Sequence, residues 1–269
     1  MHNLQTLYRY RPINEWIEPI LLKDELFFCS PSDTNDPFDC KFGLDFEQSD
    51  EVYKAFLRRI FTDPESRNKI FEATSNNRNS QIIKQIFDKY GLDAALEQMY
   101  AFGFLRNSEP QKLIQEDLIK RIQANLGICC FTEVNNSVLM FAHYADNHRG
   151  CCLGFKFGYG IAKKVNYVDA LPAVNAFPDD TERFLQDTLL TKKKDWNYEK
   201  EWRMIRYPYG KGILKFEHEA LQSIIFGCAT PREKKDYVLN LLKYRPNKVQ
   251  LYQAKAGTNS YNLEIEMLS

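Results

Sequence analysis

The sequence has no long apolar run, no excess of charge of either sign, and no internal repeat or low-complexity tract. No segment approaches the roughly 18 consecutive apolar residues of a membrane-spanning helix, and residues 1–12 contain no signal-peptide core. We therefore expect a cytoplasmic protein with no membrane partner. The 36 basic residues balance the 36 acidic ones, so no overall field attracts nucleic acid, although a local basic patch is compatible with this balance.

Several sequence motifs of common enzyme classes are also absent. No GxxxxGK[ST], GxGxxG, GxSxG or HExxH occurs, which argues against P-loop, simple Rossmann, hydrolase-elbow and zincin proteins. The seven cysteines include two adjacent pairs but no CxxC, so we expect reduced thiols that fill the core. His143 and His148 are five residues apart and do not share a helix face, so we predict no metal site.

The patterns that are present predict one α+β domain over residues 1–269. The first 40 residues alternate as strand, helix, strand and polar loop. Residues 48–126 then carry apolar residues at helical spacing, which predicts a helical insertion or subdomain whose last helix covers 113–126. Strand patterns return after the insertion, interrupted by a helix expected over 180–195. This order favours a mostly antiparallel sheet.

The most distinctive segment is NYEKEWR, residues 197–203. The pattern predicts a strand over 200–207. If the NYEKEWR segment is itself extended, Glu199 and Glu201, two residues apart, point to one side of the sheet. Two carboxylates on one face repel each other and are costly to bury, so they serve either ion pairs or chemistry. Arg203 lies on the same face as Glu201 and keeps the structural ion pair open as the alternative.

Two further segments concentrate polar side chains. The loop SPSDTNDPFD, residues 30–39, is dense in turn formers and either lines a site or is a self-capped turn. Residues 137–144 form a short predicted helix that ends in His143 and Tyr144. These two side chains either reach a cleft or, in the case of the histidine, serve a structural hydrogen bond.

Basic residues occur at two places of interest. Arg9 and Arg11 share one face of the first predicted strand, and such a pair suits either structural ion pairs or the oxygens of a phosphate group. The run Lys192-Lys193-Lys194 is typical of a solvated surface, with a contact to nucleic acid as the alternative.

Four segments together resemble a large, mostly bacterial family of unknown function. They are Leu7–Arg11, Leu26–Asp39, Cys130–Phe155 and Trp196–Arg203, which contain the motifs SPSxxNDPFD, HYADxHRG and WxYExEWR. The match keeps the same order over nearly the whole chain. Thr34 stands where an aromatic residue is usual, Asp39 where the family has Glu, and Phe141 where it has Trp. Many members of this family look like neighbours of phage-defence or toxin systems.

The same order of elements has a distant resemblance to the ADP-ribosyltransferase fold, which implies an ADP-ribosyltransferase-like sheet and NAD as substrate. The resemblance implies that Glu201 is the catalytic carboxylate and that Glu199 activates or orients the acceptor. It implies that Tyr144 or His143 contacts nicotinamide. The residues expected to bind NAD are Arg9, Tyr10, Ser30, Ser32, Asn35, Asp36 and Arg203.

Our hypothesis from the sequence is therefore an NAD-using ADP-ribosyltransferase or NAD glycohydrolase, a bacterial defence or toxin effector that modifies a protein or nucleic acid. One alternative is a metal-dependent nuclease in which Arg9, Arg149, Arg203 and His143 hold phosphates. The other is a non-catalytic sensor or interaction module.

Overall fold

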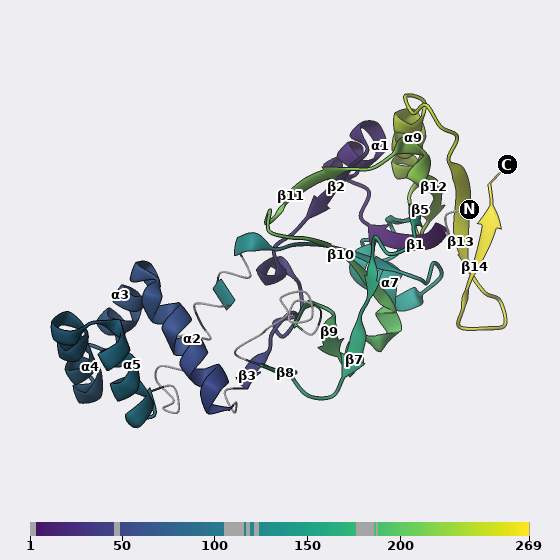
Figure 1. Ribbon diagram of the computed structural model, residues 1–269. Coiled ribbons are helices and arrows are strands. Elements are labelled where there is room, and N and C mark those ends of the chain that lie inside the picture. The colour runs from purple at the N-terminus through teal and green to yellow at the C-terminus, as the bar shows by residue number, and fades with distance from the viewer. Residues whose placement is uncertain are drawn as a thin grey trace. The chain divides into compact units, whose positions relative to one another are not determined.

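The computed structural model describes residues 4–45, 49–104, 116, 119–120, 124–175, 186 and 188–268 (Figure 1). The chain divides into two compact units. The first comprises Met1–Cys40, Gln123–Ala170 and Leu190–Ser269, and the second Lys41–Ile122 and Leu171–Leu189. The predicted α+β class with a mostly antiparallel sheet is confirmed.

The first unit is built on an eight-stranded sheet of order β14-β13-β12-β5-β1-β4-β10-β6. Each neighbouring pair is antiparallel except β12 with β13, which is parallel. Figure 1 shows β13 and β14 at one end of this sheet. The strands are β1 Leu4–Arg11, β4 Gly127–Thr132, β5 Cys151–Gly158, β6 Lys163–Lys164, β10 Glu201–Arg206, β12 Leu221–Phe226, β13 Gln250–Ala256 and β14 Leu263–Met267.

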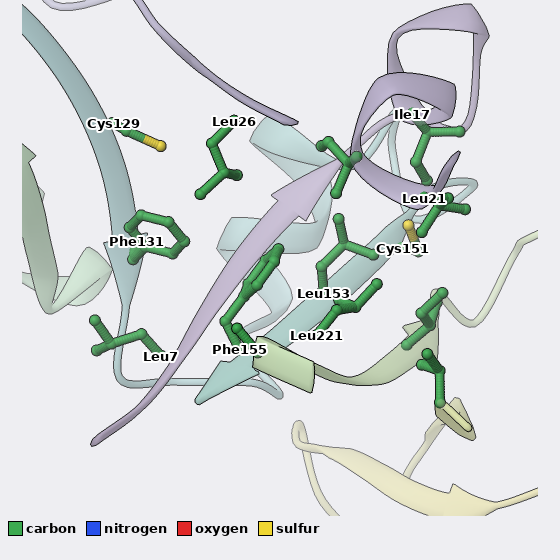
Figure 2. Packing of buried hydrophobic residues seen from close by; sticks show 14 of the residues in the cluster. Leu7, Ile17, Leu21, Leu26, Cys129, Phe131, Cys151, Leu153, Phe155 and Leu221 are labelled. Atoms are coloured by element: carbon green, nitrogen blue, oxygen red, sulfur yellow. The ribbon is translucent and has the colours of Figure 1, made fainter. Parts of the chain in front are cut away.

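Helices cover both faces of this sheet because its strands alternate apolar residues on each side. On one face, α1 (Glu18–Lys23) and α9 (Arg232–Leu242) pack over Leu7, Leu153 and Phe155. Figure 2 shows these side chains interleaved with those of α1 and β4. On the other face, α7 (Val138–Tyr144) packs against Tyr10, Cys152 and Ile225.

Among the described residues, three short strand pairs and several 3₁₀ segments lie outside the main sheet. They are β2 Glu25–Phe28 with β11 Gly212–Lys215, β7 Asn166–Val168 with β9 Thr191–Lys193, and, in the second unit, β3 Gly43–Asp45 with β8 Ala173–Asn175. The 3₁₀ segments are Glu15–Ile17, Pro31–Asp33, Lys194–Glu199 and His218–Ala220.

The second unit has its own apolar core. It contains α2 Asp50–Thr62, α3 Pro64–Ala73, α4 Arg78–Tyr90 and α5 Leu92–Ala101. The buried side chains of Leu57, Phe61, Ile83 and Met99 fill the space between these helices. Ser49, Asp63 and Asn77 cap three of the helix N-termini with their side chains, as such residues commonly do.

Two helices expected from the sequence fall mostly outside the described residues. These are the helices over 113–126 and 180–195. Within the second of them, however, Thr191–Lys193 form strand β9, so this part of the prediction is wrong. The reason is tertiary pairing, because β9 adds to β7 in parallel with Asn166 opposite Thr191. Pairing of this kind overrides the helical preference of a lysine-rich segment.

The strands β1 and β4 separate inside the sheet. β1 is paired with β5 along its whole length, but with β4 at one position, Tyr8 opposite Thr132. β4 is in turn paired with β10 at every residue. The ladder between β1 and β4 therefore ends at Tyr8, and the remaining residues of the two strands diverge around the candidate site.

Candidate functional site

A cavity of about 290 Å³ lies where β1 and β4 diverge, entirely within the first unit. Strand β1 contributes Tyr8 to Arg11, and β4 contributes Cys130 to Thr132. The remaining walls come from the loop after β2, from α7 and from the segment leading into β10. Their lining residues are Cys29, Asp33, Thr34, Asn35, Asp39, Met140, Tyr144, Lys192, Glu199 and Glu201.

Two arginines of β1 form one end of the cavity. Arg9 and Arg11 share a face of the strand, as the sequence predicts, and both side chains are half-buried. Arg9 contacts the thiol of Cys129 and lies over the ring of Phe131, 5.7 Å from its centroid. Burial and the charge of Arg9 lower the pKa of Arg11 to about 10, so Arg11 stays protonated at neutral pH. Neither forms an ion pair with a carboxylate among the described residues. Two adjacent cations without a counter-charge make this end suited to an anion.

The other end of the cavity is acidic. Glu199 and Glu201 are each 3% exposed, and the ammonium group of Lys192 lies between them. Its Nζ donates to Oε2 of Glu199 at 2.6 Å and to Oε2 of Glu201 at 3.1 Å. The second oxygen of Glu199, Oε1, accepts the hydroxyl hydrogen of Tyr144 at 2.5 Å. The amide of Asn35 donates in turn to this hydroxyl at 3.1 Å.

Behind this end, a fully buried arginine holds two acids. Arg203 Nε donates to Oε1 of Glu201 at 2.6 Å, and its Nη2 donates to Oε2 of Glu201 at 3.0 Å. The same Nη2 donates to both oxygens of Asp39, at 2.8 and 2.9 Å. We call Asn35, Asp39, Tyr144, Lys192, Glu199, Glu201 and Arg203 the polar network.

The two glutamates differ in their electrostatics. Burial opposes the ionisation of Glu201, but Arg203 and then Lys192 overcome it and lower its pKa to about 2. Burial raises the pKa of Glu199 above its ordinary value, although Lys192 and Tyr144 act in the opposite direction. Burial alone would lower the pKa of Lys192, but the two glutamates raise it, so the ammonium stays charged. Glu201 is therefore a fixed anion, whereas Glu199 is the carboxylate closer to accepting a proton.

The backbone brings both glutamates to the cavity although they are not on one strand. Glu199 ends the 3₁₀ segment Lys194–Glu199, and β10 begins at Glu201. Lys200 between them adopts a left-handed conformation with φ of 45°, which turns the chain from helix into strand. The hydroxyl of Thr132 donates to the carbonyl of Glu199 and fixes this turn against β4.

The histidine-containing motif after α7 has a structural role in the turn toward β5. Asp146, Asn147 and His148 all have positive φ, which ends α7 in a left-handed turn. Gly150 follows, and a Cβ there would lie 2.3 Å from the carbonyl oxygen of Arg11. A glycine is thus required for the close approach of this turn to the end of β1, where Arg11 faces the cavity.

The structure brings together most of the residues expected at the site. Glu199, Glu201, Tyr144, Arg9, Tyr10 and Asn35 all line the cavity. His143 does not line it; it lies on the last turn of α7 beside a second cavity. Arg203 does not line it either, because its side chain is fully buried behind Glu201.

Ser30, Ser32 and Asp36 also lie outside the cavity lining. Ser30 caps the 3₁₀ segment Pro31–Asp33 in a capping box with Asp33, and the two serine hydroxyls are 2.9 Å apart. Oδ1 of Asp36 accepts the amide hydrogen of Phe38 at 2.8 Å. The contacts of these side chains stabilise the loop that positions Asn35 and Asp39.

Two residues of the polar network, Lys192 and Asp39, were not expected from the sequence. Lys192 belongs to a lysine run that is typical of a solvated surface, yet its side chain is 5% exposed. Successive side chains of β9 point to opposite faces, so Lys192 points inward and Lys193 points outward. One signal was available, since two buried carboxylates need a cation and the lysine run is close to them in sequence. For Asp39 the sequence contains no such signal, because its position in a loop does not indicate a contact with Arg203.

No group of three or more His, Cys, Asp or Glu side chains among the described residues is arranged to hold a metal ion. Within the same residues, no helix has the length and apolarity needed to cross a membrane.

Comparison with protein-family models, with curated proteins and with solved structures finds no significant match to this chain. The resemblances drawn from its motifs therefore remain predictions, and the function is inferred from the geometry of the site.

Proposed function

We propose that the protein is an enzyme that binds NAD in the cavity between β1 and β4, cleaves its nicotinamide–ribose bond and transfers ADP-ribose to a macromolecular acceptor. The observation that carries this proposal is that arginine and glutamate side chains line one cavity. Arg9 and Arg11, without a carboxylate partner among the described residues, face it from β1, and Glu199 faces it from the segment before β10.

NAD has a matching distribution of charge. Its diphosphate carries negative charge that suits Arg9 and Arg11, and its nicotinamide ring is a cation that suits the acidic end. Ligand pockets usually enclose about 300–1,000 Å³, so a cavity of about 290 Å³ suits one half of a dinucleotide. We place the nicotinamide riboside in the cavity and the diphosphate at its arginine end, in the manner of an ADP-ribosyltransferase-like sheet.

The contacts of the two glutamates favour Glu199 as the catalytic carboxylate. Both oxygens of Glu201 already accept hydrogen bonds from Arg203. Glu199 has one cationic partner, Lys192, and one neutral partner, Tyr144. This assignment differs from the one that the resemblance implies, in which Glu201 carries the reaction.

In the proposed reaction, the bond between C1′ of the ribose and N1 of nicotinamide breaks, and its electron pair leaves with nicotinamide. The positive charge that develops at C1′ is stabilised by the carboxylate of Glu199, which is buried. A lone pair of the acceptor then forms the new bond to C1′, and the acceptor's proton passes to Glu199. Burial raises the pKa of this glutamate, which improves it as a proton acceptor.

The test measures nicotinamide release from NAD by the purified wild-type protein and the transfer of labelled ADP-ribose into a cell lysate. We expect release and labelling by the wild type, and a loss of about 100-fold or more in Glu199→Gln, with an unchanged fold by circular dichroism. Glu133→Gln is the matched control, because Glu133 is an exposed carboxylate that pairs with Lys164 and Trp202. Absence of both products from the wild-type protein would contradict the proposal and favour a binding module.

The nuclease hypothesis receives no comparable support. The carboxylates of the cavity are engaged by Lys192 and Arg203, which occupy the positions where a divalent cation would bind. A metal ion would have to displace a lysine or a buried arginine, and each displacement leaves a charge without its partner.

A further inference from the structure

A second, more open cavity of about 600 Å³ adjoins the first. The two cavities share the side chains of Tyr10, Arg11 and Tyr144. The other lining residues of the second cavity are Pro12, Ile13, Asn14, His143, Asp146 and Lys234. Because Tyr144 lines both cavities and donates to Glu199, the second cavity borders the polar network.

Arg11 and Lys234 line this second cavity, and Arg149 is held next to it by Asp146. Asp146 accepts hydrogen bonds from Arg149 and Lys234, each at 2.9 Å, so two cations share one carboxylate. Arg11 adds a third cation that has no carboxylate partner among the described residues. The chain as a whole has zero net charge, so this concentration of positive charge is local.

A row of aromatic rings flanks the polar network. The rings of Trp196 and Tyr198 are 6.1 Å apart, those of Tyr198 and His143 are 6.2 Å apart, and those of His143 and Tyr144 are 6.2 Å apart. We call these four residues the aromatic row. Trp196 also contacts the polar network, because Nζ of Lys192 lies 4.9 Å from the centroid of its ring. Tyr144, Tyr198 and Trp196 are half-buried, and His143 is exposed.

We infer that the acceptor of ADP-ribose is a single-stranded nucleic acid, bound with its phosphates at the basic side chains and its bases against the aromatic row. This inference rests on the proposed function for the identity of the donor. Aromatic rings beside basic side chains are the combination that binds single strands, since every base has a face that can stack. The same positive charge disfavours a protein acceptor that would present a lysine or arginine side chain.

An unpaired base also fits the depth of the site. Glu199 is 3% exposed, so the acceptor must insert a narrow group to bring its nucleophile near the carboxylate. The N–H groups of paired bases are engaged inside a duplex and do not reach such a site without flipping. In the reaction, a nitrogen lone pair of the base forms the bond to C1′ as the bond to nicotinamide breaks. The proton of that base N–H passes to Glu199, and neutral nicotinamide leaves.

The test measures binding without NAD, so that it is independent of catalysis. Fluorescence anisotropy follows the full-length protein with labelled single-stranded DNA and RNA of about 12 nucleotides and mixed sequence, and with the corresponding duplex. We expect tighter binding of a single strand than of the duplex, with the DNA and RNA probes showing which sugar is preferred. The affinity should fall with added salt.

Two variants locate the binding surface. Trp196→Ala should weaken single-strand binding by about fivefold or more, and Tyr261→Ala, a fully exposed tyrosine between β13 and β14, serves as its control. Lys234→Ala should weaken binding and reduce the slope of log affinity against log salt by about 0.7. Its control is Lys243→Ala, which alters the exposed lysine that caps the other end of α9. Equal binding by wild type, Trp196→Ala and Lys234→Ala would overturn the inference, as would a duplex bound as tightly as the single strand.

The outcomes separate this inference from the proposed function. Nicotinamide release without any single-strand binding would overturn the acceptor assignment and leave the donor chemistry intact. Single-strand binding that is lost in both variants, in a protein that releases no nicotinamide, would support the surface and contradict the proposed enzyme.

Discussion

Replacing Glu201 by glutamine should destabilise the first unit far more than the same change at Glu199. The two side chains are equally buried and two residues apart, so they form a matched pair. Glu201→Gln removes the charge that faces fully buried Arg203, which retains Asp39 as an ionic partner. Glu199→Gln removes a carboxylate whose ionisation is already disfavoured by burial. The amide oxygen of the glutamine can still accept the hydrogen bond from Tyr144.

The expected magnitudes follow from these contacts. Removal of one partner from a buried ion pair costs about 3–5 kcal/mol in the free energy of unfolding. Lowering the pKa of Glu201 from 4.5 to about 2 corresponds to about 3 kcal/mol at neutral pH, which agrees with the lower end of that range. Glu199→Gln also removes the charge that faces Lys192 at 2.6 Å, but Lys192 retains Glu201 as an ionic partner, so we expect the smaller loss of about one charge-assisted hydrogen bond, about 1.5 kcal/mol. The melting temperatures should fall by about 10 °C and by less than about 5 °C respectively.

Tryptophan fluorescence during urea or thermal unfolding is the appropriate assay. The chain has three tryptophans, Trp16, Trp196 and Trp202, and all of them belong to the first unit, so the signal reports that unit. A result in which Glu199→Gln is as destabilising as Glu201→Gln would refute the reasoning, because the two glutamates would then have equivalent structural roles.

Further predictions concern pH, backbone packing and the reaction. The stabilisation by Glu201 should be fully present above about pH 4.5 and disappear as the pH falls toward about 2, so the difference in unfolding free energy between the wild type and Glu201→Gln should shrink over that range. Gly150→Ala should cost about 1–3 kcal/mol in the free energy of unfolding and weaken NAD binding, because the added Cβ would meet a carbonyl of β1. Gly43→Ala is the control, since no atom lies within 4 Å of its added Cβ, and it should show neither effect in the same titrations. Tyr144→Phe removes a hydrogen bond that lowers the pKa of Glu199. The acid limb of the pH profile of kcat/KM for nicotinamide release should therefore move to higher pH. An unchanged pH profile would argue against proton acceptance by this glutamate.

The periodic elements of the first unit could be predicted from sequence because their signals are local. The alternation in residues 5–11 matches β1, and Asn14 caps the 3₁₀ turn that precedes α1. The short helix predicted over 137–144 corresponds to α7, and Ser137 caps its N-terminus. These features depend on interactions between residues near one another in the chain.

The arrangement of the site was harder to predict from the sequence because it depends on contacts between residues far apart in the chain. Nothing local shows that the ladder between β1 and β4 ends at Tyr8, although this divergence makes the cavity. Strand periodicity placed Glu199 and Glu201 on one strand, whereas the left-handed Lys200 separates a helix end from a strand start. The inward direction of Lys192 depends on the pairing of β9 with β7.

The measurement that tests the central claim most directly is a calorimetric titration of NAD, ADP-ribose and nicotinamide riboside into the wild type and Arg11→Ala. If the cavity holds the diphosphate at its arginine end, Arg11→Ala should lose about tenfold or more in affinity for NAD and ADP-ribose. Its affinity for nicotinamide riboside, which has no phosphate, should match that of the wild type. Absence of NAD binding by the wild type, or an equal loss for all three ligands in the variant, would contradict the account.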